Sequence, residues 1–484
     1  MGAKPALLNK PSHSLALPQF ASKTHWTTAA CIFAADLVTL SLVFGLGILG
    51  RHLVTPTYHL SSYFEIFPCL ALLLCAFWIQ GLYPGVLLHA AEEMRRIFFA
   101  ITIVFLVMAS TTFLWHNALA YSRSVFLITW AAGSPLVLLT RHILRRTLGE
   151  KPWWGVPALV LGSGPPAQRV VRTLRDGMLG VKVIGIVSDE NALSWEEVLP
   201  PVLGDFSAAS GIAASRFAQY AIIAMPQKSN VELRHVIQDY CHGFSHVLLV
   251  PDFPGLCSLG VSACEIGGEV GFELPQRLFH RSAAAIKRGL DLLLAGLVAI
   301  AISPLFLIIC IAIKATSRGA VFYGQSRYGR KGEIFKALKF RSMAPDADAL
   351  LAEYLAAHPE HLFEWQRDHK LKDDPRVTRV GKWLRRFSLD ELPQILNVLV
   401  GQMSLVGPRP IVQAEIKKYG RGYDLYTRVR PGITGLWQVS GRSNTTYDER
   451  VALDEYYVRN WSIWLDAYIL VRTVKVVITA DGAY

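Results

Sequence analysis

The sequence predicts an integral membrane protein of mixed α and β structure, and three observations carry this prediction. Hydrophobic residues make up 52% of the 484 residues, a share typical of membrane proteins. Four apolar runs fill the first third of the chain, and strand and helix patterns alternate after them. A fifth apolar run opens the last part. We therefore expect a four-helix transmembrane bundle, a cytoplasmic α/β domain with a parallel sheet, and a C-terminal domain attached to the membrane.

The charge and the cysteines narrow the classes of partner. The formal net charge is +12, which suits nucleic acid, anionic lipid or phosphorylated substrates. The basic residues stand singly inside apolar motifs and form no polybasic arm, so we expect lipid and phosphorylated substrates and no nucleic acid. The seven cysteines include no Cys-x-x-Cys pair, which supports neither a zinc site nor a disulfide framework.

The N-terminal part is predicted to be a tail followed by four membrane spans. Residues 1–25 are polar and are expected to form a disordered cytoplasmic tail; the transmembrane domain covers 26–147, with apolar runs at 26–49, 63–83, 97–115 and 124–140. Arg95 and Arg96 follow the second run and Arg141 follows the fourth, and cytoplasmic loops are enriched in such residues. Both termini are therefore predicted on the cytoplasmic side. Asp36 lies inside the first span, where a charge marks either a functional site or a helix-packing contact.

Residues 155–250 are predicted to form a Rossmann-like α/β domain. A buried-strand pattern at 158–161 runs into a Gly-x-Gly turn and then a helical stretch, and a second strand ends near Asp189. Amides at such a helix start can hold a pyrophosphate, and an acidic residue at that distance can bind a ribose. Gly162, Gly164 and Asp189 thus form a possible nucleotide turn. Pro165 and Pro166 lack two of the N–H groups, so a scaffold or sensing role is favoured over tight dinucleotide binding.

Residues 251–280 are rich in Pro and Gly and predict a linker to the C-terminal domain, residues 281–484. That domain begins with an apolar run that Ser303 and Pro304 interrupt. Each half is too short to cross a bilayer, because a span needs roughly 20 residues. Lys287 and Arg288 precede the run and further basic residues follow it, which places both ends on the cytoplasmic side. We therefore predict a re-entrant helix over 284–316, a hairpin that dips into one leaflet and returns. A proline-kinked spanning helix is the alternative.

Charged residues after this helix indicate a phosphate-handling site. Lys339 and Arg341 fall on one face of an extended segment, because side chains alternate along a strand; they either pair with phosphate or face solvent. Ser388 and Glu391 have the spacing of a capping box, which predicts that a helix begins there with Asp390 in its first turn. The helix dipole would keep Asp390 ionised and able to attack, and Glu391 suits Mg²⁺.

Later segments add to this site. Arg409 stands between two prolines, and a restricted backbone suits the presentation of a guanidinium to phosphate. The Gly-rich segment 430–442 ends at Arg442 and contains an aromatic residue, a composition that can lie against a nucleotide. The segment 461–478 has the pattern of an amphipathic helix at a membrane interface, with packing against the enzyme core as the alternative.

These motifs resemble those of the monotopic polyprenyl-phosphate phosphoglycosyl transferases, and most closely the long undecaprenyl-phosphate galactose phosphotransferases. The matching motifs follow the family's order through residues 281–484: Lys287-Arg288, Ser303-Pro304, Gln325-x-Arg327-x-Gly329, Lys339-Phe340-Arg341-Ser342-Met343, Asp374-Pro375-Arg376, Ser388-Leu389-Asp390-Glu391-Leu392-Pro393-Gln394, Gly407-Pro408-Arg409-Pro410 and Pro431-Gly432-Ile433-Thr434-Gly435. The resemblance implies a monotopic catalytic domain with a re-entrant helix and amphipathic interfacial helices.

The resemblance also implies a reaction and residue roles. Such an enzyme transfers a hexose 1-phosphate, here expected to be galactose 1-phosphate, from a UDP-sugar to undecaprenyl phosphate and releases UMP; UDP-glucose is the alternative donor. Asp390 would be the nucleophile that carries a covalent phosphosugar, and Glu391 would hold Mg²⁺ against the diphosphate. The phosphate-binding candidates are Arg376, Arg385 and Arg409, followed by Lys339, Arg341 and Arg442. Arg386 duplicates the cation beside Arg385, so either of the two can face the site.

The implied setting is the bacterial inner membrane, with the catalytic domain of a homodimer on the cytoplasmic face of the phospholipid bilayer, at the first membrane step of O-antigen, capsule or exopolysaccharide synthesis. Two other classes stay open. A membrane-anchored NAD-dependent nucleotide-sugar dehydratase or oxidoreductase predicts a tightly bound dinucleotide. A non-catalytic scaffold of polysaccharide assembly predicts that Asp390→Asn changes no lipid product. The density of motifs after residue 281 favours the transferase.

Overall fold

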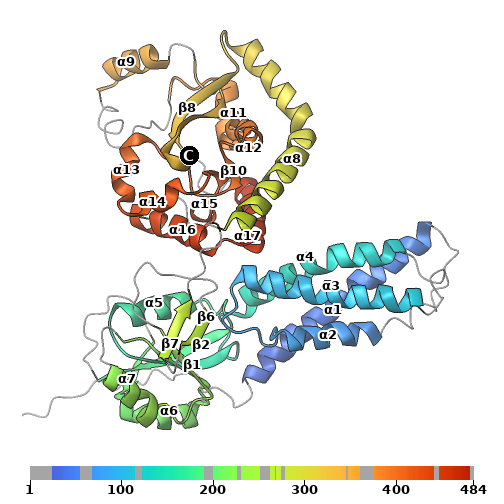
Figure 1. Ribbon diagram of the computed structural model, residues 1–484, viewed down its shortest axis with the longest axis vertical. Coiled ribbons are helices and arrows are strands. Elements are labelled where there is room, and N and C mark those ends of the chain that lie inside the picture. Colours follow the sequence, from blue (N-terminus) through green and yellow to red (C-terminus); the bar gives the residue numbers. More distant parts are fainter. Residues whose placement is uncertain are drawn as a thin grey trace, which may run out of the picture. The chain divides into compact units, whose positions relative to one another are not determined.

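The computed structural model describes most of the chain as two compact units, Met1–Phe253 and Pro254–Tyr484. The described residues are 24–54, 68–114, 123–189, 200–225, 230–250, 262–266, 269–273, 278, 280–344, 347–359, 374–440 and 446–479. Figure 1 shows a helical bundle and a sheet in the first unit, and helices around short strands in the second. The boundary between the units falls inside the predicted linker.

Four helices of the first unit lie side by side as a bundle (Figure 1). They are α1 (Thr24–Val54), α2 (Pro68–Ile79), α3 (Ala90–Leu114) and α4 (Arg123–Leu148). Each contributes to one buried core, through side chains such as Phe44, Phe77, Ile101 and Val137. Helices α1, α3 and α4 are long and apolar enough to cross a membrane, whereas α2 is shorter. The predicted four-helix bundle is confirmed, whereas membrane spanning by all four helices stays a prediction. The run predicted at 63–83 is described only from α2 onward.

A five-stranded parallel sheet follows the bundle. Its strands are β1 (Val156–Leu161), β2 (Val181–Val187), β3 (Val202–Gly204), β4 (Tyr220–Ile223) and β5 (His246–Leu249), in the order β3-β2-β1-β4-β5. Between them lie α5 (Pro165–Leu174), η2 (Phe206–Ala208), α6 (Ala209–Arg216), α7 (Asn230–His235) and η3 (Val236–Tyr240). Leu159 packs into the core on one face of the sheet and Val160 into the core on the other, because successive strand residues point to opposite faces. The predicted α/β domain is therefore confirmed.

The second unit combines short strands with helices. Its strands are β6 (Ser262–Ile266), β7 (Glu269–Glu273), β8 (Phe322–Tyr328), β9 (Ile334–Phe340), β10 (Ser404–Val406) and β11 (Gly432–Thr434). Its helices are α8 (Arg281–Thr316), η5 (Arg330–Gly332), α9 (Ala347–Ala357), α11 (Arg379–Arg386), η7 (Leu389–Glu391), α12 (Gln394–Val400), α13 (Gln413–Tyr419), α14 (Gly422–Thr427), α15 (Leu436–Val439), α16 (Tyr447–Asn460) and α17 (Ile463–Thr479). Strands β6 and β7 pair antiparallel, so the segment predicted as a linker at 251–280 also contains a hairpin.

Helix α8 is continuous through the predicted break. It has 36 residues with Pro304 inside, and Figure 1 shows it bent around the second unit. Its first half packs through Ala295 in one cluster with Phe335, and its second half packs through Ile313 in another cluster with Phe340. Strand β9 therefore contributes to the apolar clusters of both halves. Its exposed face is apolar and includes Leu293, Leu297, Ile300, Leu307 and Ile311.

Helix α17 combines the two alternatives predicted for residues 461–478. Leu465 and Ile469 are buried in a core shared with Tyr457 of α16. Val471 and Val474 are exposed. One face of α17 therefore packs against the unit, and an apolar face remains outside.

Candidate active site

The acidic pair from the sequence lies on a short turn between two helices. Asp390 and Glu391 belong to η7, which connects α11 to α12. Ser388, just before it, has a left-handed backbone with φ 54°, and its side chain makes no capping hydrogen bond. Helix α12 begins only at Gln394, after Pro393, because proline suits the start of a helix. The predicted capping hydrogen bond is absent, but a short 3-10 helix does begin after Ser388 with Asp390 in its first turn, as predicted. Because these residues form no full α-helix, the argument that a helix dipole ionises Asp390 loses its support.

Strand β9 places Lys339 beside this turn. One edge of β9 pairs with β8, and Asn397 of α12 satisfies backbone groups of β9. The Asn397 amide nitrogen donates to the Lys336 carbonyl at 2.8 Å, and its oxygen accepts from the Leu338 amide at 2.9 Å. Because buried backbone groups need such partners, Asn397 ties α12 to β9. The next residue of the strand, Lys339, consequently reaches η7.

A single ammonium group contacts both carboxylates of the pair. Nζ of Lys339 lies 2.6 Å from Oε1 of Glu391 and 3.7 Å from Oδ2 of Asp390. Burial raises the pKa of Asp390 above its usual range; Lys339 opposes the rise and Glu391 adds to it. Burial also acts to raise the pKa of Glu391, but Lys339 and two arginines outweigh burial and lower it. Neighbouring carboxyls with pKa values displaced in opposite directions are suited to different roles.

Arg385 is the cation of α11 that faces the pair. Its charge favours the ionised form of Asp390, and its Nε donates to Ser342 Oγ at 3.0 Å. Gly381, one turn earlier, lets α11 lie against Ser342, since a Cβ there would collide with the Ser342 carbonyl. Arg386 instead lies over the ring of the following residue, 5.8 Å from its centroid. The ambiguity between the two arginines is resolved in favour of Arg385.

Arg409 and Arg327 add positive charge on the Glu391 side. Both charges act to lower the pKa of Glu391. The guanidinium carbon of Arg409 lies 5.5 Å from the ring centroid of Trp437, and Arg327, on β8, donates to the Pro410 carbonyl at 3.2 Å. Arg327 belongs to a motif noted in the sequence, but only the fold shows that it lies near Glu391.

Two predicted phosphate-binding residues make contacts away from the acidic pair, and a third is not described. Arg341 follows β9 and donates to the carbonyls of Ser317 and Arg318 at 3.1 and 2.9 Å, so it caps the end of α8. A role for Arg341 in phosphate binding stays a prediction. Arg376 forms a two-point ion pair with Asp374 through bonds of 2.8 and 2.7 Å. Arg442 lies outside the described residues. Of the predicted cations, Lys339, Arg385 and Arg409 are the ones placed around the acidic pair.

The basic residues predicted to flank the membrane helix make contacts inside the second unit. Lys287 Nζ lies 2.9 Å from Asp466 of α17 and 3.3 Å from Asp291. Arg288 donates to two carbonyls at the end of α12, where a cation also suits the helix dipole. The hydroxyl of Ser303 donates to a carbonyl one turn earlier in α8. Arg288 therefore anchors α8 to the helix that follows the acidic pair, and Lys287 anchors it to α17.

The possible nucleotide turn has the backbone that its glycines predict. Gly162 and Gly164 have φ angles of 124° and 84°, in the region that favours glycine. Pro165 and the next proline occupy the first positions of α5. Asp189 accepts a hydrogen bond from the Phe206 amide at 3.0 Å. This local bond favours the scaffold interpretation, and nucleotide binding stays a prediction.

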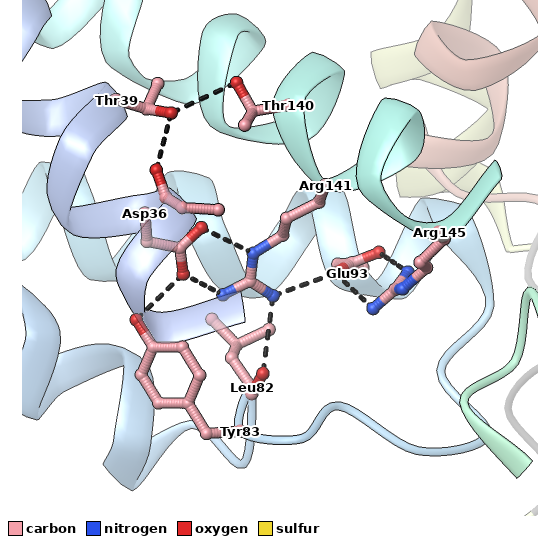
Figure 2. Close-up of polar contacts among 9 residues, drawn as sticks. Asp36, Thr39, Leu82, Tyr83, Glu93, Thr140, Arg141 and Arg145 are labelled. Carbon is pink, nitrogen blue, oxygen red and sulfur yellow. Dashed lines mark hydrogen bonds and ion pairs between the residues drawn. The ribbon is translucent and has the colours of Figure 1, made fainter. Parts of the chain in front are cut away.

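Figure 2 shows how the intramembrane charge of Asp36 is compensated. Arg141 Nε donates to one carboxylate oxygen of Asp36 at 3.0 Å, and the Tyr83 hydroxyl donates to the other at 2.8 Å. Arg141 also donates to Glu93 at 2.9 Å, and Glu93 accepts from Arg145 at 2.6 Å. These contacts join α1, α3 and α4, and they favour a helix-packing role for Asp36.

Comparisons with known proteins match both units. A family described as bacterial sugar transferase matches residues 282–480, and one described as CoA-binding domain matches residues 79–251. The first match contains the whole acidic site, and the second contains the parallel sheet.

Relatives of similar length extend this likeness. A protein of Salmonella typhimurium named undecaprenyl-phosphate galactose phosphotransferase is 36% identical over 81% of this chain and 82% of its own length. A UDP-galactose-lipid carrier transferase of Erwinia amylovora is 35% identical over 81% and 82%. A UDP-glucose:undecaprenyl-phosphate glucose-1-phosphate transferase of Klebsiella pneumoniae is 35% identical over 65% and 66%.

Proposed function

This chain belongs to the bacterial sugar transferase family and is a phosphoglycosyl transferase. From that premise we propose that it moves galactose 1-phosphate from UDP-galactose to undecaprenyl phosphate, through a covalent intermediate on Asp390. The acidic pair carries the proposal: its two pKa values are displaced in opposite directions, and both carboxylates lie near one lysine. Family membership favours this chemistry over the dehydratase and the non-catalytic scaffold.

Asp390 is the proposed nucleophile. Its ionised carboxylate attacks the β-phosphorus of the UDP-sugar, so a phosphorus–oxygen bond to Asp390 forms and the bond from that phosphorus to the UMP oxygen breaks. UMP leaves with the bonding electrons. A phosphate oxygen of undecaprenyl phosphate then attacks the same phosphorus, and the Asp390 carboxylate leaves. Two successive displacements let a soluble donor and a lipid acceptor use one small site in turn.

Fixed cations are suited to stabilise the phosphoryl group during both steps. Negative charge is spread over the phosphoryl oxygens in the transition state, and preorganised positive groups lower its energy. Lys339, Arg385 and Arg409 approach the acidic pair from three different elements or loops. We assign them to the phosphates of the donor.

The acidic pair also fits Mg²⁺. The ion takes one or two carboxylates together with substrate phosphates and waters, and Asp390 and Glu391 supply carboxylates. Among the residues with described positions, no group of three or more His, Cys, Asp or Glu is suited to a metal ion, so donor phosphates would complete the site. We assign Glu391 to hold Mg²⁺, which would neutralise charge on the diphosphate. Lys339 would then release Glu391. We expect EDTA to stop UMP release and added Mg²⁺ to restore it.

The contacts of α8 support a re-entrant rather than a spanning helix. The bilayer core is about 30 Å thick, whereas a strand of seven residues extends only about 23 Å. Strand β9 nevertheless contributes to the apolar clusters of both halves of α8, which keeps both halves beside one folded unit. We place this unit on the cytoplasmic face of the inner membrane, the side to which the basic loops assign it.

Cysteine labelling tests this topology. Ser282→Cys and Arg318→Cys mark the two exposed ends of α8, and an impermeant maleimide should label both in inverted vesicles and neither in intact cells. The chain with its native cysteines alone gives the background. Labelling from opposite sides would instead indicate a spanning helix.

A homodimer, which the resemblance also implies, is tested by light scattering of the solubilised protein.

Galactose is the proposed sugar because the galactose-named relatives match more of the chain than the glucose-named one. The covered shares are 81% and 65% of this chain. With equal concentrations of UDP-galactose and UDP-glucose, we expect galactose in the lipid product. A predominance of glucose would assign the alternative donor and leave the reaction class unchanged.

UMP release tests the reaction itself. Solubilised protein is incubated with Mg²⁺, undecaprenyl phosphate and each UDP-sugar, and Asp390→Asn should abolish UMP release. Asp424→Asn, at an exposed position of the same unit, is the matched control and should retain it. Without the lipid acceptor, intact-protein mass spectrometry should detect a phosphosugar on the wild type and not on Asp390→Asn. Continued turnover by Asp390→Asn would remove Asp390 from its role.

A further inference from the structure

The backbone of the Pro408-Arg409-Pro410 segment is held at three points. Proline has no N–H, so the Arg409 amide is the only backbone donor of the segment, and it donates to the carboxylate of Asp454. The Pro408 carbonyl accepts from the Gly432 amide at 2.8 Å. The Pro410 carbonyl accepts from Arg327 at 3.2 Å. Asp454 is thus the partner of the one donor that this segment possesses.

Asp454 is a buried acid that the proposed chemistry does not use. It lies on α16 and is 3% exposed, and the Tyr419 hydroxyl donates to its Oδ2 at 2.7 Å. A buried carboxyl costs free energy unless hydrogen bonds compensate it. Arg450 and Arg409 contribute nearby positive charge. The two donors to Asp454 come from different parts of the unit, so Asp454 connects α13 to the segment that bears Arg409.

The side chain of Arg409 is positioned as well as its backbone. Its guanidinium carbon lies 5.5 Å from the Trp437 ring centroid, and that of Arg450 lies 4.8 Å from the same ring. Arg450 in turn donates to Glu415 at 3.0 Å. The amide of Arg409 is thus held by Asp454, its guanidinium lies beside Trp437, and its charge acts on Glu391.

We propose that Asp454 is a positioning residue that fixes the Arg409 amide and thereby aims the Arg409 guanidinium at the diphosphate of the donor. This inference rests on the proposed function, and it deepens that function by naming the group that sets the geometry of one phosphate-binding cation. Asp454 touches neither substrate nor phosphorus. Its effect on the rate passes entirely through Arg409.

A double-mutant cycle separates this role from a general structural one. Asp454→Ala should lower kcat for UMP release about 10–100-fold, the cost of a small misplacement, with a smaller change in KM for the UDP-sugar. Arg409→Ala should lower kcat at least as much. Because Asp454 acts through Arg409, the double variant should be no slower than Arg409→Ala alone. If the fold-loss of kcat in the double variant equalled the product of the two single fold-losses, the proposal would be overturned.

Further variants complete the test. Asp454→Asn keeps an acceptor oxygen and should recover most of kcat. Tyr419→Phe removes the other donor to Asp454 and leaves the Arg409 bond, so it should lower the melting temperature while kcat is retained. A loss of kcat as large as that of Asp454→Ala would contradict the proposal. Where Asp454→Ala does not fold, Asp454→Val, which is bulkier than alanine and likewise has no acceptor, takes its place in the cycle. An unchanged rate in Arg409→Ala, with Asp390→Asn inactive, would sink this inference and leave the proposed function standing.

Discussion

The ammonium of Lys339 lies 2.6 Å from a carboxylate oxygen of Glu391 and forms the shortest ion pair at the acidic turn. It contributes to lowering the pKa of Glu391 and opposes the rise in the pKa of Asp390. One lysine on β9 therefore influences both partners of the proposed mechanism.

Replacing this lysine should slow the reaction and change its pH dependence. In Lys339→Met the pKa of Asp390 should rise further, because a favourable positive charge is lost, and kcat should fall by about 10²–10³-fold, the usual cost of removing one transition-state contact. The acid limb of the pH–rate profile should move to higher pH. Lys339→Arg, which keeps the charge, should leave that limb near its wild-type position. A loss of rate without any change in the profile would contradict this electrostatic role.

Wild-type UMP release should decline with acid at a higher pH than an ordinary aspartate would give. The ionised carboxylate is the nucleophile, so protonation of Asp390 stops attack as the pH falls through its pKa. Burial raises that pKa above 3.8. The residual activity of Glu391→Gln should show the acid limb at lower pH, because the like charge of Glu391 contributes to the rise. Rapid-mixing measurements of the first turnover across pH provide the profile.

The ion network of Figure 2 should be important for the stability of the bundle. Asp36→Asn leaves the buried Arg141 without its main counter-charge, and breaking one partner of a buried pair typically costs about 3–5 kcal/mol. Thr140→Val, which removes a neutral hydrogen bond of 3.1 Å to Thr39 in the same region, is the control and should cost much less. Thermal unfolding in detergent compares the two. Equal melting temperatures for Asp36→Asn and the wild type would show that the network is dispensable.

Asp454 should make stability depend on pH. Burial raises its pKa to about 7, against about 3.9 for an unfolded aspartate. The folded state therefore favours the protonated form of Asp454. The contribution of this proton to the free energy of unfolding is complete below about pH 4 and is lost as the pH rises toward 7. Asp454→Asn removes this titration. The difference in melting temperature between variant and wild type should shift in favour of the variant from pH 5 to pH 8, and a constant difference would refute the linkage.

Local sequence patterns predicted the first unit well. The strand expected at 158–161 and the one expected to end near Asp189 correspond to β1 and β2, because a continuous apolar run bounded by glycine is typical of a buried parallel strand. The Gly-x-Gly turn also has the expected backbone. These features depend on residues close together in the chain.

The site was harder to predict because its contacts are distant in sequence. Arg341 binds Ser317, 24 residues earlier, and no periodicity indicates that partner. The spacing of Ser388 and Glu391 matched a capping box, but a proline after the pair started the helix later. Asp454 has no local signal at all: it is one acid in a helical pattern, and only the fold brings it to Arg409.

Because α8 belongs to the unit that starts at Pro254, whereas α1, α3 and α4 belong to the other, each half of the polypeptide has a helix long and apolar enough to cross a membrane. We therefore expect each half to hold on to lipid without the other. A protease cut between the halves would consequently not free the transferase into buffer. Carbonate or high-salt washing should leave both fragments in the pellet, and only detergent should extract them.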